Sequence, residues 1–267
     1  MRSLLLCSRN VATCCRNILS FANNNPGRHD MIKTLSTQTQ PQTEIEKKET
    51  VSLNPIHHED YFQVKKMVTV KDLFNARVHY GHKEGSLNEY MVPYIFGSRM
   101  GHLIFDLDQT LKMLHQALNV AAHIAYRDGV ILFVTQSPQH CHLIEKTAQE
   151  CKEFVHTRSW RQGMLTNSTM MFGAVTRLPD LIIMFSTLTT VLDNHQAVVE
   201  AAKMAIPTIA VVDSNSNPNI ITYPIPGNDD SAVSIQLYCR LFKEAILKGK
   251  AERKRVLEMY KGQSSDS

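Results

Sequence analysis

The sequence predicts an α/β fold: a doubly wound, Rossmann-like and mainly parallel sheet with helices on both faces. From Val68 onward, short apolar runs alternate with longer stretches whose apolar residues recur at helical spacing. The runs VILFVT, LIIMF and TIAVVD are continuously apolar, as expected of strands buried on both faces. Strands that alternate with helices join into a parallel sheet through right-handed crossovers.

The first half of the alternation contains two helices and two strands. In order, we expect a helix over residues 68–81, a strand over 102–107, a helix over 109–129 and a strand over 130–135. The first helix is amphipathic and is expected to end near Gly81. Asp108 is placed to cap the second helix, and Gly129 is placed to close it.

The second half continues the same pattern. In order, we expect a helix over residues 139–151, strands over 154–160 and 181–185, a helix over 189–204, strands over 208–213 and 220–225, and a helix from Ser231 to roughly Lys250. Pro138 is expected in the first turn of the helix that follows it, where its missing N–H costs nothing. No apolar run approaches the roughly 20 residues that cross a bilayer, so no membrane partner is expected.

Composition divides the chain into four segments. Residues 1–29 contain arginine, leucine and serine but no acid, which is typical of a cleaved mitochondrial transit peptide and also of an unstructured tail. Residues 30–66 are polar and without periodicity, and we expect a flexible extension that folds against a partner. Residues 67–250 form the expected α/β domain, and residues 251–267 form a basic C-terminal tail.

The net charge is +4, but its position limits what it implies. Arg2, Arg9, Arg16 and Arg28 account for all of it, so residues 30–267 are neutral overall. A protein that bound nucleic acid through counterion release alone would have a more basic body. Charge therefore does not by itself indicate an RNA-binding protein.

Motifs for nucleotide chemistry are missing from the sequence. No G-x-G and no G-x4-G-K-S/T occurs, and Pro138 interrupts the loop after 130–135, where a phosphate would need backbone N–H donors. The run that begins at Asp213 resembles a calcium loop, but its sixth position is Pro218 and its twelfth is Pro224. His79 and His82 lack the further ligands of a structural zinc site. We expect no metal, no cofactor and no catalytic residues.

The remaining candidates are polar loops that suit RNA. GSRMG (97–101), SWRQGMLTN (159–167) and the basic last helix contain arginine, tryptophan, asparagine and glycine, which contact RNA phosphates, sugars and unstacked bases. Each of these loops taken alone is more typical of a solvated surface.

Taken in order, these elements resemble one family, ribosomal protein two of the small subunit. The resemblance runs from about Val68 to Lys250 and is carried by VHYGH (78–82), PYIFGSRMG (93–101) with the following IFDLDQT, SWRQGMLTN, RLPDLIIM (177–184), EAAKMAIPTIAVVDSNSNP (200–218) and ITYPIPGNDDS (221–231). It implies an α/β body near the head–body junction of the small subunit, bound to ribosomal RNA and neighbouring proteins, with no enzymatic activity. Together with the presequence, it implies a mitochondrial member, located in the matrix and not expected to form homo-oligomers.

The chain departs from the bacterial pattern of this family at several positions. Arg77 stands where bacterial members usually have glycine, Ser159 replaces an arginine, and Leu87-Asn88-Glu89-Tyr90 replaces a Trp-Asn-Pro-Lys run. Bacterial members also insert a long helical hairpin where this chain has only STMMFGAVT between Asn167 and Arg177. We expect that protrusion to be absent and protein contacts to be more numerous than in bacteria.

The resemblance identifies the residues that we expect to contact RNA. They are His79, His82, Arg99, Trp160, Arg161, Asn167 and Arg177, with Asn215 and Asn217 as weaker candidates. The arginines would contact phosphates, and Trp160 and the histidines would stack or contact base edges. The alternatives are a matrix enzyme on a Rossmann-like fold and an RNA-binding regulator that acts away from the ribosome.

The turn TYPIPGNDDS leads into the last helix. Its adjacent carboxylates suit an active site, but they also suit the positive end of a helix dipole. We expect Asn228, Asp229 or Asp230 to cap the helix that begins near Ser231.

Overall fold

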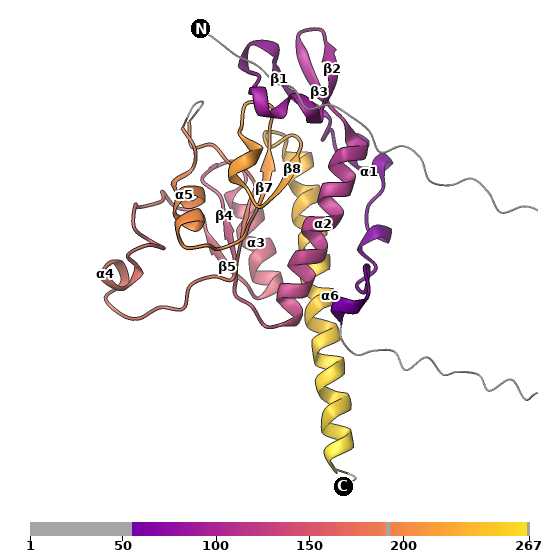
Figure 1. Cartoon of the computed structure of the whole chain (residues 1–267), viewed down its shortest axis with the longest axis vertical. Helices are drawn as coiled ribbons and strands as arrows, with labels where there is room; N and C mark the ends of the chain where they lie inside the picture. Colours follow the sequence, from indigo (N-terminus) through magenta and orange to yellow (C-terminus); the bar gives the residue numbers. More distant parts are fainter. Residues whose placement is uncertain (1–54, 191–192, 266–267) are drawn as a thin grey trace, which may run out of the picture. The chain divides into compact units, whose positions relative to one another are not determined.

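The computed structural model describes residues 55–190 and 193–265, and the side chains up to Met259 (Figure 1). The predicted transit peptide, and the predicted extension up to residue 54, lie outside the described residues. No helix in the described part of the chain has both the length and the apolarity to cross a membrane.

Five parallel strands form the main sheet. They are β4 (Ile131–Val134), β5 (Phe154–His156), β6 (Leu181–Met184), β7 (Thr208–Val212) and β8 (Tyr223–Pro226), in the spatial order β5-β4-β6-β7-β8. Every residue of β6 and of β7 is buried, as their continuous apolar sequences predict. The predicted α/β fold with a parallel sheet and helices packed on it is therefore confirmed.

Alternate residues of the same strands contribute to two separate cores. Phe133, Ile183 and Val211 belong to a core that includes residues of the long helices α2 (Leu107–Tyr126), α3 (Cys141–Cys151) and α6 (Ala232–Ser265). The neighbouring strand residues, such as Val134 and Met184, belong to a second core with the short helix α5 (Gln196–Lys203). Because successive side chains of a strand point to opposite faces, the two cores lie on opposite faces of the sheet. Figure 1 shows α5 and α2 on either side of it.

Three further strands form a small antiparallel sheet before the main sheet begins. They are β1 (Tyr80–Lys83), β2 (Ile95–Arg99) and β3 (His102–Phe105), in the order β1-β3-β2. The short helices η3 (Glu84–Ser86) and η4 (Glu89–Tyr94) join β1 to β2. The turn between β2 and β3 has positive φ angles at Met100 and Gly101, which suits a tight hairpin.

The predicted helix over residues 68–81 is too long. The helix α1 (Val70–Asn75) begins with a capping box between Thr69 and Asp72, and it ends six residues later. Arg77 then adopts a left-handed backbone conformation that a helix cannot continue through, and β1 begins at Tyr80.

Four other predicted boundaries require correction. The cap of α2 is Asp106, which accepts a hydrogen bond from the N–H of Asp108, and not Asp108 itself. The strand predicted over 154–160 ends at residue 156, and the helix predicted over 189–204 begins only at Gln196, after an N-cap by His195. Pro138 lies in a turn before α3 and not within its first turn. The crossover from β5 to β6 contains the five-residue helix α4 (Ser168–Phe172).

The last helix extends well beyond its predicted end at Lys250. It continues to Ser265, so most of the predicted basic tail is helical. It crosses α2 closely at Gly249, where an added Cβ would collide with the carbonyl oxygen of Ala122. Glycine at this position lets the two backbones approach each other.

The segment before α1 corrects the predicted extension over residues 30–66. Its described part contains η1 (Pro55–His57) and η2 (Val64–Lys66), and Phe62 and Val64 are buried in the first core. In the sequence, this segment has only isolated apolar residues without periodicity, so its packing against the first core could not be predicted. The α/β domain therefore begins earlier than residue 67.

Candidate functional site

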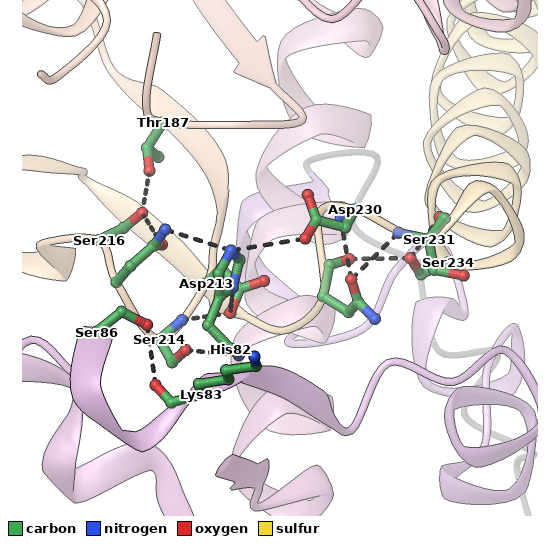
Figure 2. Close-up of polar contacts among 12 residues, drawn as sticks. His82, Lys83, Ser86, Thr187, Asp213, Ser214, Ser216, Asp230, Ser231 and Ser234 are labelled. Atoms are coloured by element: carbon green, nitrogen blue, oxygen red, sulfur yellow. Dashed lines mark hydrogen bonds and ion pairs between the residues drawn. The ribbon is translucent and has the colours of Figure 1, made fainter. Parts of the chain in front are cut away.

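A polar network occupies the carboxyl ends of β7 and β8. Asp213 follows β7, Asp230 follows β8, and His82 reaches the same place from β1 (Figure 2). The Nδ1 of His82 lies 3.2 Å from Asp213 Oδ1, and its Nε2 lies 3.6 Å from Asp230 Oδ2. The backbone N–H of His82 donates to Ser214 Oγ at 3.0 Å. We call His82, Asp213, Ser214, Asp229 and Asp230 the His82 cluster.

The electrostatics of the His82 cluster favour a charged imidazole. The hydrogen bond to Asp213 raises the pKa of His82 to about 9 against the opposing effect of burial, and the negative charges of Asp213, Asp230 and Asp229 add to the rise. Burial, followed by the negative charge of Asp213, raises the pKa of Asp229 above its usual range. At neutral pH the imidazolium therefore joins the small sheet to the main sheet, beside a carboxyl group that is driven toward its neutral form.

The His82 cluster is the only set in the described residues with metal-ligand geometry. The ligand atoms of His82, Asp213 and Asp230 lie within 4.8 Å of one another. Carboxylate oxygens and an imidazole nitrogen are suitable ligands for a divalent cation. In the present arrangement, however, both ring nitrogens face carboxylates, and the protonated ring itself supplies the compensating positive charge. The chemistry that follows directly is an ion-pair bridge between two sheets.

Hydroxyl and amide groups extend this network toward β6. The hydroxyl of Thr187 donates to Ser216 Oγ at 2.8 Å, and Ser216 Oγ donates to Asn215 Oδ1 at 3.2 Å. The amide nitrogen of Asn215 lies 3.5 Å from His82 Nε2. Asn217 accepts a hydrogen bond from the N–H of Asn219 and so caps η5 (Pro218–Ile220). Both asparagines that we predicted to contact RNA thus have roles within the fold.

The turn before α6 assigns different roles to the three predicted capping residues. Asn228 Oδ1 accepts from the N–H groups of Asp230 and Ser231, and its Nδ2 donates to the carbonyl of Arg77 at 3.2 Å. The prediction that Asp229 or Asp230 caps the helix is wrong. The side chain of Asp229 forms hydrogen bonds with Ser186 and Asp213, and that of Asp230 faces His82. The turn therefore directs both carboxyl groups toward the His82 cluster.

His79, a predicted RNA contact, is largely buried beside two aromatic rings. Only 9% of the residue is exposed, and its ring stacks on Phe74 with centroids 4.6 Å apart and tilts against Tyr80 at 4.2 Å. Burial lowers its pKa, so the ring is neutral at physiological pH. The exposed aromatic side chains at this place are Phe74 and Tyr80, which the sequence did not single out.

Arg99, a predicted RNA contact, is exposed on the small sheet. It ends β2 and, with Phe74, Tyr80 and Met100, lines an open cavity of about 790 Å³. Its guanidinium makes no hydrogen bond or ion pair within the described part of the chain, and Met100 beside it is largely exposed. The hairpin turn holds both side chains outward.

A buried carboxylate shapes the loop over residues 159–167. Glu200 of α5 accepts hydrogen bonds from the N–H of Gly163 at 2.6 Å and from the N–H of Leu165 at 2.9 Å. The sequence does not reveal the role of Glu200, because nothing in an alanine-rich helical stretch distinguishes a buried glutamate from a solvated one. Arg161 and Asn167 are exposed on the loop that Glu200 holds.

Trp160 faces inward more than its predicted stacking role requires. Its ring contacts His156 at 5.0 Å and His195 at 5.9 Å, edge-on in both cases, and packs against the second core. Burial lowers the pKa of His195 to about 4, and its Nδ1 accepts from the N–H of Ala197, so this ring is neutral. The indole of Trp160 therefore packs against the second core and does not project outward from the loop over residues 159–167.

Arg177 also has a partner inside the fold. Its guanidinium lies 2.9 Å from Asp180 Oδ2, and the same carboxylate oxygen accepts from the N–H of Val130 at 2.8 Å. The structure thus leaves Arg99, Arg161, Asn167 and Arg177 exposed. It brings His82 and Asn215 into one network and places Trp160 and Arg177 beside an apolar groove.

Comparison with known proteins gives a consistent result. The family described as ribosomal protein S2 matches residues 73–190 and 170–249. The chain is 49% identical over 226 residues to the small ribosomal subunit protein uS2m of Bos taurus, covering 85% of this chain and 77% of the bovine protein. It is 35% identical over 229 residues to the small ribosomal subunit protein uS2 of Rickettsia bellii, covering 69% of this chain and 77% of the bacterial protein. The chain belongs to the ribosomal protein S2 family.

Proposed function

We propose that this chain is a structural constituent of the mitochondrial small ribosomal subunit, where it binds ribosomal RNA and neighbouring proteins. The observation that carries the proposal is the 49% identity to the bovine mitochondrial protein, which extends over 85% of the chain. The arginine-rich, acid-free first 29 residues support import into the matrix. A position near the head–body junction rests on the family resemblance.

The His82 cluster supports this proposal over the alternative of a matrix enzyme. Enzymes with open parallel sheets bind their ligands outside the carboxyl ends of the strands. Here that edge is occupied by an ion-paired histidine and by Asp213, which is 1% exposed. A phosphate group would meet the carboxylates of Asp213 and Asp230 at this place, and those groups repel anions. The arrangement is explained by a structural role, in which the ion pairs of His82 hold the two sheets together.

Exposed cations and polar groups are the candidates for RNA contact. Arg99 on the hairpin, and Arg161 with Asn167 on the loop held by Glu200, are available to phosphates and sugars. His82 is the fourth candidate, since its side chain is 31% exposed at the cavity lined by Lys83 and His102; because carboxylates surround its ring, it would contact a base edge and not a phosphate. Because residues 30–267 are neutral overall, with acids offsetting the exposed cations, we favour an assembly in which proteins supply much of the contact area.

The bacterial-type helical hairpin is, in our proposal, reduced here to α4. Only nine residues separate Asn167 from Arg177, and α4 accounts for five of them. A pair of antiparallel helices does not fit in that length. Any partner that depends on the hairpin in bacteria would have lost its site in this protein.

Depletion of the protein in cells, followed by rescue, tests the proposed function. We expect assembled mitochondrial small subunits to decrease and the synthesis of mitochondrially encoded proteins to fall, with both restored by the full-length chain. Normal subunits and normal synthesis after depletion would refute the proposal. Calorimetry of the purified protein with a panel of nucleotides should show no heat of binding, whereas saturable binding would favour the enzyme alternative.

A further inference from the structure

One face of the main sheet is covered unevenly. The first core is covered by α2, α3 and α6, but in the described part of the chain α5 is the one helix of eight or more residues against the second core. The apolar space beside β4 and β5 is lined by residues of those strands and of the β5–β6 crossover, residues 157–180, and by none of α5. That crossover contains only α4, between two long loops (Figure 1). This half of the face therefore lacks the helix that normally covers a parallel sheet.

An apolar groove of about 640 Å³ lies at this place. Its lining includes Val130, Leu132, Phe154, Trp160, Phe172 and Leu178. Phe154 is 61% exposed and Phe172 is 53% exposed, although burying either ring would be favourable. The volume is in the range of sites that enclose a ligand or anchor residues of a partner. Rings left open to water around such a groove indicate an interaction surface.

The groove is held in shape before any partner arrives. Glu200 fixes the loop that carries Trp160 through its bonds to Gly163 and Leu165, and Leu165 is buried. On the other side of the groove, Asp180 ties Arg177 to the start of β4. A preformed groove reduces the ordering cost of binding.

The surroundings of the groove are cationic. Arg158 and Arg161, on either side of Trp160 in the sequence, are exposed and make no hydrogen bond or ion pair within the described residues. Arg177 lines the groove, and its charge is compensated by Asp180. Two uncompensated arginines close in sequence to the groove-lining Trp160 complement a segment that carries both acidic and large apolar side chains.

RNA fits this groove less well than a polypeptide does. The aliphatic side chains of Val130, Leu132 and Leu178 neither stack on bases nor hydrogen-bond to base edges. The indole of Trp160 is partly buried against the second core and makes T-shaped contacts with two histidines, so part of its surface is already covered within the fold. Large apolar side chains of a protein partner would fill the same space.

We infer that this groove is the docking site for a segment of a neighbouring small-subunit protein that carries large apolar residues flanked by acidic ones. The inference rests on the proposed function, because it takes the partner from the same subunit. Phe154 and Phe172 contact the apolar residues of that segment, and Arg158 and Arg161 pair with its acids. The segment supplies the cover that the β5–β6 crossover does not.

Photo-crosslinking in intact small subunits tests the inference. Benzoylphenylalanine is placed at Phe172 in the full chain, with a matched control at Val175, which is 92% exposed and outside the groove lining. We expect the Phe172 probe to attach to one ribosomal protein, at a peptide with acidic residues next to large apolar ones. An adduct to RNA, an adduct to a second copy of this chain, or no adduct in subunits that contain the chain would each overturn the inference.

A second measurement separates docking from folding. The substitution Phe172→Glu should lower the yield of that adduct, read from a probe at Phe154, by about tenfold or more, because an anchor residue is lost. Val175→Glu should leave the yield unchanged. Unchanged yield in Phe172→Glu, with the chain still folded and sedimenting with subunits, would overturn the inference alone. Failure of the unmodified chain to sediment with subunits would instead refute the proposed function, and the inference with it.

Discussion

The charged state of His82 gives a stability that should depend on pH in a defined direction. Its pKa rises from an ordinary 6.5 to about 9 in the folded protein, chiefly through the hydrogen bond to Asp213. One pKa unit corresponds to 1.36 kcal/mol, so the folded state prefers the charged ring by roughly 3 kcal/mol. Because 31% of the side chain is exposed, screening reduces this contribution to about 2 kcal/mol.

The sign follows from the direction of the shift. A pKa that is higher in the folded than in the unfolded state stabilises fully below about pH 6.5, and this stabilisation is lost as the pH rises through about 9. The assay is urea unfolding of the full chain between pH 6 and pH 10, for the native protein and for His82→Gln. Asp229 titrates in both proteins, so the difference between them isolates the contribution of His82 to first order.

We expect His82→Gln to be less stable by about 2 kcal/mol at pH 6.5, with the difference closing toward pH 10. His102→Gln, at a ring that lines the same cavity without an ion pair in the described residues, serves as the matched control and should follow the native protein. If the native protein and His82→Gln lose stability in parallel over this range, the ion-pair bridge does not contribute as argued.

The other predictions concern Glu200, the α2–α6 crossing and Arg99. Glu200→Ala should lower the free energy of unfolding by about 2–4 kcal/mol, because two backbone N–H groups lose a charged acceptor. Urea unfolding measures this loss, and a loss below 1 kcal/mol would contradict the prediction. Gly249→Ala should be destabilising by about 1–3 kcal/mol despite alanine's helix propensity, since its Cβ would collide with the Ala122 carbonyl. The control Gly97→Ala places its Cβ in open space. Equal melting temperatures of the two variants would argue against the close crossing of α2 and α6. Arg99→Glu should weaken RNA binding and reduce its salt slope by about 1 in filter-binding titrations, and an unchanged slope would remove Arg99 from the interface.

The regular part of the fold was readable from the sequence for a physical reason. Strands β6 and β7 are buried on both faces, so their composition is uniformly apolar and does not depend on register. The α2 helix repeats its apolar residues at helical spacing over 20 residues, which no strand can mimic. In these elements local pattern and tertiary packing select the same residues.

The boundaries and the site depended on contacts between distant residues. Asp106 and Asp108 are both suitable caps, and only the path of the chain into α2 decides between them. His79 belongs to a motif that suits RNA, but packing turns its ring onto Phe74. Asp229 stands at a helix start, where a carboxylate is normally exposed, but the turn directs it toward Asp213. None of these contacts can be predicted from a single sequence.

The most direct test of the account is the amount of this chain per small subunit in mitochondria. Small subunits are separated on a density gradient after a high-salt wash, and the chain is quantified by mass spectrometry against other subunit proteins. We expect one copy per subunit, resistant to the wash, because a structural constituent is held by RNA and protein contacts together. A chain found mainly in the soluble matrix fractions, or present in only a small share of subunits, would contradict it.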